Sequence, residues 1–298
     1  MKWKGVMPAI STCFDENYSV DHNFMTRHCR WLLDQGCTGI IALGTLGEGA
    51  TLTFDEKLQI LRTCVRSADG RAPVLAGISS LSTSGAVELA RAAIDLGCAG
   101  LMVLPPYVYH GDWREMKTHV TAVFNAVPVS CMLYNNPVAY GTDFLPVQIQ
   151  ELASEHENLQ AVKESSMDAR RVSAIRALVG SRLEVSVGVD DAVLETVGVG
   201  ASGWVSGLAN ALPKESVNLL TLALNGEREK AFELYRWFLP LLRMDTVPKF
   251  VQLIKLVQSE VGMGNSRVRP PLLELAGSEL EEARRTIKDV LQNRPGKA

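Results

Sequence analysis

The sequence Leu159-Gln160-Ala161-Val162-Lys163-Glu164-Ser165-Ser166 has the pattern of a short buried strand that ends on a lysine. Apolar residues precede the charge, and the two serines mark the turn into a helix. A lysine at this place has two explanations. Its stem can lie along apolar surface while the ammonium reaches water. Alternatively, partial desolvation lowers its pKa, so that the amine can attack a carbonyl and form a Schiff base.

Similar apolar strands recur along the chain, and each is followed by a helical pattern. The expected strands cover residues 6–14, 40–43, 73–78, 101–104, 129–134, 159–163, 183–187 and 203–206. Unbroken apolar strands joined by helices indicate a parallel sheet that is buried on both faces. Eight such units in about 225 residues match the size of a (β/α)8 TIM barrel, predicted here for residues 1–226. The alternative, a doubly wound open sheet, would need a crossover reversal that we do not find in the sequence.

No strand is expected after residue 226. Residues 228–242, 247–257 and 278–291 have helical patterns, and the first of these segments is more apolar than a free helix needs. We therefore expect residues 227–298 to form a C-terminal helical extension that packs on the barrel or on another subunit. The last residues, 293–298, are expected to be loose.

The composition is that of an ordinary globular protein, with 47% hydrophobic residues, 21% charged residues and a net charge of −3. The absence of a basic excess argues against a nucleic-acid partner. No apolar run is long enough to span a membrane, and the N-terminus lacks a signal-peptide pattern. Six scattered cysteines without a C-x-x-C motif are expected to be reduced core thiols of a cytoplasmic protein.

The candidate site residues lie where the predicted strands end, because the active site of a TIM barrel lies at the C-terminal ends of its strands. They are Thr45, Tyr107, Tyr134, Lys163, Asp190 and Ser206. A lysine there can form an imine, and the phenols can move protons. Taken singly, each tyrosine could also simply pack its ring and point its hydroxyl at water.

Two other patterns have more than one interpretation. The loop from Gly44 to Gly49 matches neither nucleotide-binding motif, but its backbone amides could bind a carboxylate, or it could be only a tight turn. Asp190, Asp191 and Glu195 have helical spacing, but helix capping explains Asp190 equally well. Because the histidines show no paired-ligand spacing, neither a metal nor another cofactor is expected.

Four motifs resemble those of the dihydrodipicolinate synthase / N-acetylneuraminate lyase family of class I Schiff-base aldolases. They are Gly44-Thr45-Leu46-Gly47-Glu48, Tyr134-Asn135-Asn136-Pro137, Val162-Lys163-Glu164 and Gly188-Val189-Asp190-Asp191. The resemblance runs through nearly the whole chain and implies a pyruvate-type 2-oxo acid substrate and a homotetramer. It also implies that Lys163 forms the imine, that Tyr134 relays protons, and that Thr45 belongs to the relay.

The resemblance assigns the remaining candidates as well. The amides of Thr45 and Leu46 match the site for the substrate carboxylate, and Tyr107 matches a relay tyrosine that a neighbouring subunit supplies. Tyr109 competes with Tyr107 because this loop does not align cleanly. Asp190 and Ser206 match positions that contact substrate hydroxyls in the sialate-lyase branch.

Two departures bear on the substrate. Ala139 stands where dihydrodipicolinate synthases have an arginine that binds the second substrate's carboxylate, and Leu46 replaces a threonine. Loss of that arginine would weaken semialdehyde binding by about 1.5–3 kcal/mol. The sequence therefore favours a catabolic lyase that cleaves, condenses, dehydrates or deaminates a hydroxylated 2-oxo acid. The alternatives are a 4-hydroxy-tetrahydrodipicolinate synthase of lysine biosynthesis and a non-catalytic barrel that binds a 2-oxo acid.

Overall fold

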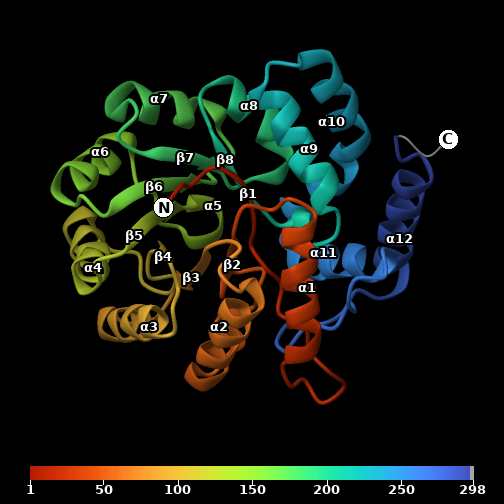
Figure 1. Cartoon of the computed structure of the whole chain (residues 1–298), viewed down its shortest axis with the longest axis horizontal. Coiled ribbons are helices and arrows are strands. Elements are labelled where there is room, and N and C mark those ends of the chain that lie inside the picture. Colours follow the sequence, from red (N-terminus) through yellow and green to blue (C-terminus); the bar gives the residue numbers. More distant parts are fainter. Residues whose placement is uncertain (296–298) are drawn as a thin grey trace.

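Eight parallel strands form the centre of the fold (Figure 1). The computed structural model of the chain describes residues 1–295. The strands are β1 (Gly5–Pro8), β2 (Ile40–Ala42), β3 (Val74–Ile78), β4 (Gly100–Val103), β5 (Ser130–Asn135), β6 (Leu159–Glu164), β7 (Glu184–Val187) and β8 (Gly203–Ser206). β1 pairs with β8, the other strands follow in chain order, and a parallel bridge from Ala9 to Ile41 closes the sheet. The predicted barrel is confirmed.

Each strand leads into at least one helix, and the helices form an outer ring around the barrel (Figure 1). The ring consists of α1 (His22–Asp34), α2 (Phe54–Ala68), α3 (Thr83–Asp95), α4 (Trp113–Ala126), α6 (Pro146–Glu155), α7 (Ala169–Val179), α8 (Val193–Gly198) and α9 (Pro213–Leu224). A short extra helix, α5 (Pro137–Tyr140), follows β5, and 3-10 turns η1 (Gly49–Thr51), η2 (Asp190–Ala192) and η3 (Leu208–Asn210) follow β2, β7 and β8.

Local signals fix several helix boundaries. The start of α2 is one of them, because Thr53 and Glu56 form a reciprocal capping box. The predicted first strand is too long, since β1 ends at Pro8 instead of residue 14. Backbone pairing continues only to Ile10, and the next amide, that of Ser11, donates to the Asn210 side chain at 3.1 Å. A side-chain acceptor therefore replaces the strand ladder at this point.

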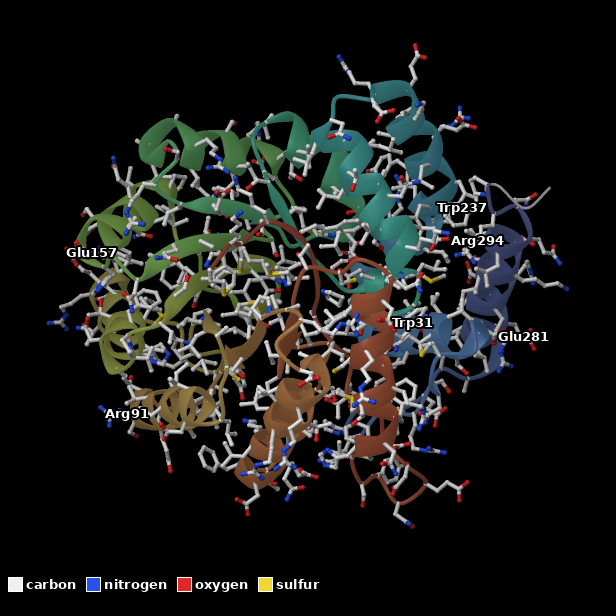
Figure 2. All side chains as sticks on the ribbon, in the orientation of Figure 1. Trp31, Arg91, Glu157, Trp237, Glu281 and Arg294 are labelled. Atoms are coloured by element: carbon white, nitrogen blue, oxygen red, sulfur yellow. The ribbon has the colours of Figure 1, made fainter. Side chains whose placement is uncertain are left out.

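The described part of the C-terminal extension, residues 227–295, consists of helices joined by loops, the longest of which covers residues 261–276. It comprises α10 (Arg228–Leu242), η4 (Arg243–Asp245), α11 (Phe250–Glu260) and α12 (Gly277–Gln292), which lie on the side of the barrel next to α1 and α9 (Figure 1). Trp237 donates a hydrogen bond to the Val290 carbonyl at 2.8 Å, and Arg294 pairs with Glu215 of α9 (Figure 2). The helix predicted from residue 247 begins at residue 250. Of the predicted loose tail, residues 296–298 lie outside the described residues.

The apolar core has two parts. Side chains between the sheet and the outer helices form the larger part, and a smaller cluster fills the barrel interior from Trp3 at its base to Tyr134 and Tyr140 near its mouth. All six cysteines are free and buried, in agreement with the predicted core thiols. In residues 1–295 we find no helix with the length and apolar character needed to cross a membrane.

Candidate active site

A cavity of about 440 Å³ opens at the C-terminal ends of the strands. Its walls include Thr45, Leu46, Tyr134, Ala139, Tyr140 and Lys163. A larger hollow of about 840 Å³ lies at the opposite end of the barrel, but its walls are mainly backbone, apolar groups and two lysines from the first four residues. The smaller cavity combines a lysine with phenols and a hydroxyl, and it is therefore the candidate site.

Lys163 lies on β6 directly opposite Tyr134 of β5, and only 6% of the residue is exposed. Its Nζ atom lies 4.1 Å from the centre of the Tyr134 ring. Burial lowers the pKa of Lys163 to about 8, although the carboxylates of Asp245 and Asp190 oppose this shift. The explanation of Lys163 as a surface stem with a solvated ammonium is therefore wrong.

A chain of hydroxyl groups lies beside this amine. The Thr45 hydroxyl is hydrogen-bonded to the Tyr140 hydroxyl, and the Tyr134 and Tyr140 rings meet edge to face with centroids 5.7 Å apart. Asn136 donates a hydrogen bond to the Tyr134 hydroxyl at 3.0 Å. Burial raises the pKa of Tyr134 to about 12 and also raises that of Tyr140, so both phenols are protonated at neutral pH.

Tyr140 is a site residue to which the sequence assigns no catalytic role. It ends the four-residue helix α5, which Asn136 caps and Pro137 starts, and this turn brings the chain back over the mouth. Gly141 then leaves the helix in a left-handed conformation, with φ of 67°. The signal that could have found Tyr140 is its place in the same motif as Tyr134, six residues further on.

The loop that carries Thr45 and Leu46 is tightly folded. Leu43 and Glu48 both have a left-handed backbone, with φ of 66° and 53°. At Gly49 an added Cβ atom would lie 2.5 Å from the Leu43 carbonyl oxygen, so only glycine fits there. The loop is thus a tight turn, and the carboxylate-binding role of its amides stays a prediction.

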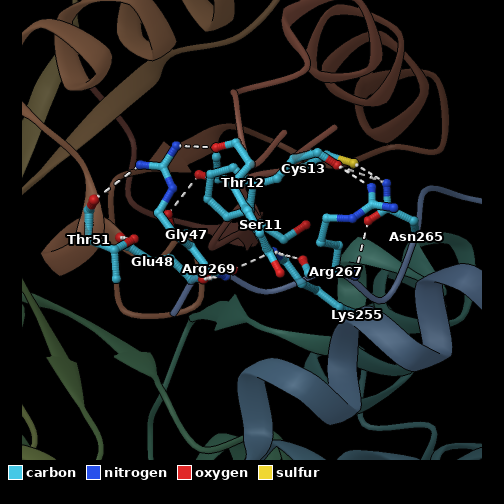
Figure 3. Close-up of polar contacts among 12 residues, drawn as sticks. Ser11, Thr12, Cys13, Gly47, Glu48, Thr51, Lys255, Asn265, Arg267 and Arg269 are labelled. Atoms are coloured by element: carbon cyan, nitrogen blue, oxygen red, sulfur yellow. Dashed lines mark hydrogen bonds and ion pairs between the residues drawn. The ribbon is translucent and has the colours of Figure 1, made fainter. Parts of the chain in front are cut away.

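The C-terminal extension holds this loop through Glu48 (Figure 3). The buried Glu48 carboxylate forms an ion pair with Lys255 of α11 and accepts a hydrogen bond from the Arg269 backbone at 2.8 Å. Lys255 also donates to the Arg267 carbonyl at 2.8 Å, and its Nζ atom lies 4.6 Å from the Phe14 ring centre. The extension therefore takes part in positioning the site.

Asp190 and Ser206 are fully buried and do not line the cavity. Asp190 accepts hydrogen bonds from Trp204 at 2.8 Å, from Ser206 at 3.1 Å and from the Leu208 amide at 2.7 Å. Burial raises its pKa to about 6. The helix-capping interpretation of Asp190 is wrong, because its carboxylate bonds to β8 and the segment after it instead of to its own helix. No cluster of three metal-ligating side chains is found in residues 1–295.

The two candidate relay tyrosines of the β4 loop lie differently. Tyr107 is half-buried and packs against the cluster that contains Tyr134 and Tyr140, but it does not line the cavity of its own chain. Tyr109 is exposed and donates to Glu115 at 3.0 Å. Ala139 does line the cavity, and Lys163 is the one cation among the residues of its wall, all of which are described.

Comparisons with known proteins show the family and the fold. A sequence profile of the Dihydrodipicolinate synthetase family matches residues 2–290. The chain is 32% identical over 287 residues to the 4-hydroxy-tetrahydrodipicolinate synthase of Methanococcus maripaludis strain C7, covering 96% of this chain and 98% of that one. Its fold matches the dihydrodipicolinate synthase of Aquifex aeolicus with a TM-score of 0.93 and 29% identity, covering 99% and 100% of the two chains. The chloride-inhibited synthase of Acinetobacter baumannii, solved with pyruvate, matches with a TM-score of 0.91 and 29% identity, covering 97% of this chain and 99% of that one.

Proposed function

The chain belongs to the dihydrodipicolinate synthetase family, whose enzymes are lyases of the aldolase type, and from this premise we propose that it forms a Schiff base between Lys163 and a small 2-oxo acid. The observation that carries the proposal is the buried Lys163 amine in a cavity that it shares with Thr45, Tyr134 and Tyr140. The pyruvate complex of the Acinetobacter relative supports the substrate class.

The first step needs a neutral amine. With a pKa of about 8, about a tenth of Lys163 is neutral at pH 7, against roughly one part in three thousand for a lysine with its ordinary pKa of 10.5. The amine nitrogen attacks the keto carbon and forms a carbinolamine, which loses its hydroxyl as water to leave a protonated imine. The imine then accepts electrons when a bond at the neighbouring carbon breaks.

The hydroxyl chain is proposed to move the protons of these steps. Tyr134 gives its proton to the departing carbinolamine hydroxyl, and the hydrogen-bonded Tyr140 and Thr45 hydroxyls return a proton to it. In the next step the hydroxyl chain, which has given one proton to the departing water, takes up a proton from C3, and an enamine forms. The enamine electrons then expel a group from C4, which takes up a proton from the same chain. In retro-aldol cleavage the C4 hydroxyl instead gives its proton to the hydroxyl chain and becomes a carbonyl, while the electrons of the breaking C3–C4 bond form the enamine directly.

We propose that the substrate is a hydroxylated 2-oxo acid of catabolism. Because residue 139 is alanine, the cavity has no guanidinium to bind a second substrate carboxylate. Lys163 is the one cation in the cavity wall, and its nitrogen becomes part of the imine. The names of the relatives favour a second candidate, 4-hydroxy-tetrahydrodipicolinate synthase. A non-catalytic barrel that binds a 2-oxo acid is a third, which turnover of any 2-oxo acid would refute.

Two assays separate the candidates. In the first, pyruvate and aspartate semialdehyde are combined with a coupled reductase, and the second screens 4-hydroxy-2-oxo acids for release of pyruvate, water or ammonia. We expect a rate near background in the first assay and turnover in the second. The reverse pattern would establish the synthase. A homotetramer, proposed from the family likeness with Tyr107 meeting a neighbour's mouth, is tested by analytical ultracentrifugation.

A further inference from the structure

Asp245 brings a carboxylate from the C-terminal extension into the wall of the cavity. It ends the 3-10 turn η4, and its side chain lies against Gly207 at the end of β8. An added Cβ atom at Gly207 would come within 2.1 Å of Asp245 Oδ1. The Gly207 backbone has φ of −78°, which any residue can adopt. The backbone conformation therefore does not require a glycine here, and the role of Gly207 is to leave space for the Asp245 carboxylate.

The Asp245 carboxylate has unused acceptor capacity. In residues 1–295 no side chain donates a hydrogen bond to it and no cation lies within ion-pair distance. An ionised carboxylate can accept about four hydrogen bonds. Asp245 is half-buried and lines the cavity, so a ligand in the cavity can reach its carboxylate.

The charge at Lys163 decides the state of this carboxyl during turnover. Burial and the nearby Asp190 carboxylate raise the pKa of Asp245, whereas positive charge at Lys163 lowers it. The protonated imine on Lys163 carries a full positive charge, whereas the free amine is partly neutral at pH 7. A bound substrate therefore favours the ionised form of the Asp245 carboxyl. The site then holds a fixed cation and a facing anion.

We propose that Asp245 determines substrate specificity by accepting a hydrogen bond from a hydroxyl or a protonated nitrogen at the far end of the bound 2-oxo acid. This inference rests on the proposed function and deepens it. A substrate with a second carboxylate at that end would meet a like charge without a compensating cation, so the same residue rejects it. The substrate class is therefore a 2-oxo acid with one carboxylate and a distal donor.

The test is a competition for Lys163 that needs no turnover. Isotope-labelled pyruvate is trapped on the enzyme with borohydride, and 4-hydroxy-2-oxopentanoate, 2-oxopentanoate and 2-oxoglutarate are titrated to find the concentration of each that halves the labelled adduct. Pyruvate released by cleavage of the hydroxylated acid gives an unlabelled adduct, which the mass separates and whose share is subtracted. For the wild type we expect the hydroxylated acid to compete about 10- to 100-fold better than 2-oxopentanoate. In Asp245→Asn this preference should shrink to about threefold or less, and 2-oxoglutarate should compete better than in the wild type.

Two further variants complete the design. Asp191→Asn removes a neighbouring carboxylate that faces Arg243 and does not line the cavity, and it should keep the wild-type preference. Gly207→Ala displaces the Asp245 carboxylate without removing it, and it should lose the preference as Asp245→Asn does. An unchanged preference in both Asp245→Asn and Gly207→Ala would overturn the proposal, as would a wild type without any preference. Absence of a pyruvate adduct in the wild type would instead remove the proposed function, and this inference with it.

Discussion

Replacing Lys255 by methionine tests how the C-terminal extension supports the site. The side chains of Lys255 and Glu48 are 2% and 1% exposed, so their ion pair is shielded from water. Methionine fills much of the same space but leaves the Glu48 carboxylate with the Arg269 amide and without its cation. Removal of one partner of a buried pair costs about 3–5 kcal/mol, because an uncompensated charge stays behind. We expect this loss in the free energy of unfolding.

The assay is urea unfolding followed by tryptophan fluorescence, after a test that the transition is cooperative. Lys249→Met is the matched control, because its pair with Glu279 is about half exposed and should cost about 1 kcal/mol or less. The double variant Lys255→Met/Glu48→Gln should recover a large part of the loss, since no buried charge is left unpaired. A loss below about 1 kcal/mol in Lys255→Met, or no recovery in the double variant, would refute the reasoning.

Three further predictions concern the cavity. Ala139→Arg adds a guanidinium at the mouth and should raise condensation of pyruvate with aspartate semialdehyde about tenfold or more in the coupled assay; an unchanged rate would contradict the explanation of Ala139. Tyr140→Phe keeps the ring but removes the hydroxyl bonded to Thr45, so kcat should fall about 100-fold while the pyruvate adduct still forms. An equal loss of kcat and of pyruvate adduct in Tyr140→Phe would show that the hydroxyl has a structural effect only. Because only the neutral amine attacks, the rate of imine formation at Lys163 should rise with pH to a plateau with its midpoint at about 8. A midpoint near 10.5 would contradict the effect of burial.

The barrel and most of the named residues of the cavity wall could be predicted from the sequence because both depend on local patterns. Strand periodicity gave the eight units, and the rule that barrel sites lie at strand ends led to Thr45, Tyr134 and Lys163. The family motifs added Leu46 and Ala139, which also line the cavity. None of these residues needs a distant segment to bring it to the mouth.

The missed residues depend on segments whose placement no local pattern specifies. Tyr140 reaches the mouth only because α5 turns back, and Asp245 reaches it only because the extension packs beside β8. The helix-capping interpretation of Asp190, one of those that the sequence leaves open, fails for the same reason, since its partners Trp204 and Ser206 belong to the next strand. Lys255 had no sequence signal that distinguished it from a surface lysine.

The central claim is that Lys163 is the nucleophile, and trapping of its imine tests this most directly. The protein is incubated with pyruvate, reduced with borohydride and digested, and the peptides are analysed by mass spectrometry. We predict one pyruvate-derived adduct, located on Lys163 and absent from Lys163→Arg, while Lys255→Met still forms it. No adduct, or an adduct on another lysine, would contradict the account.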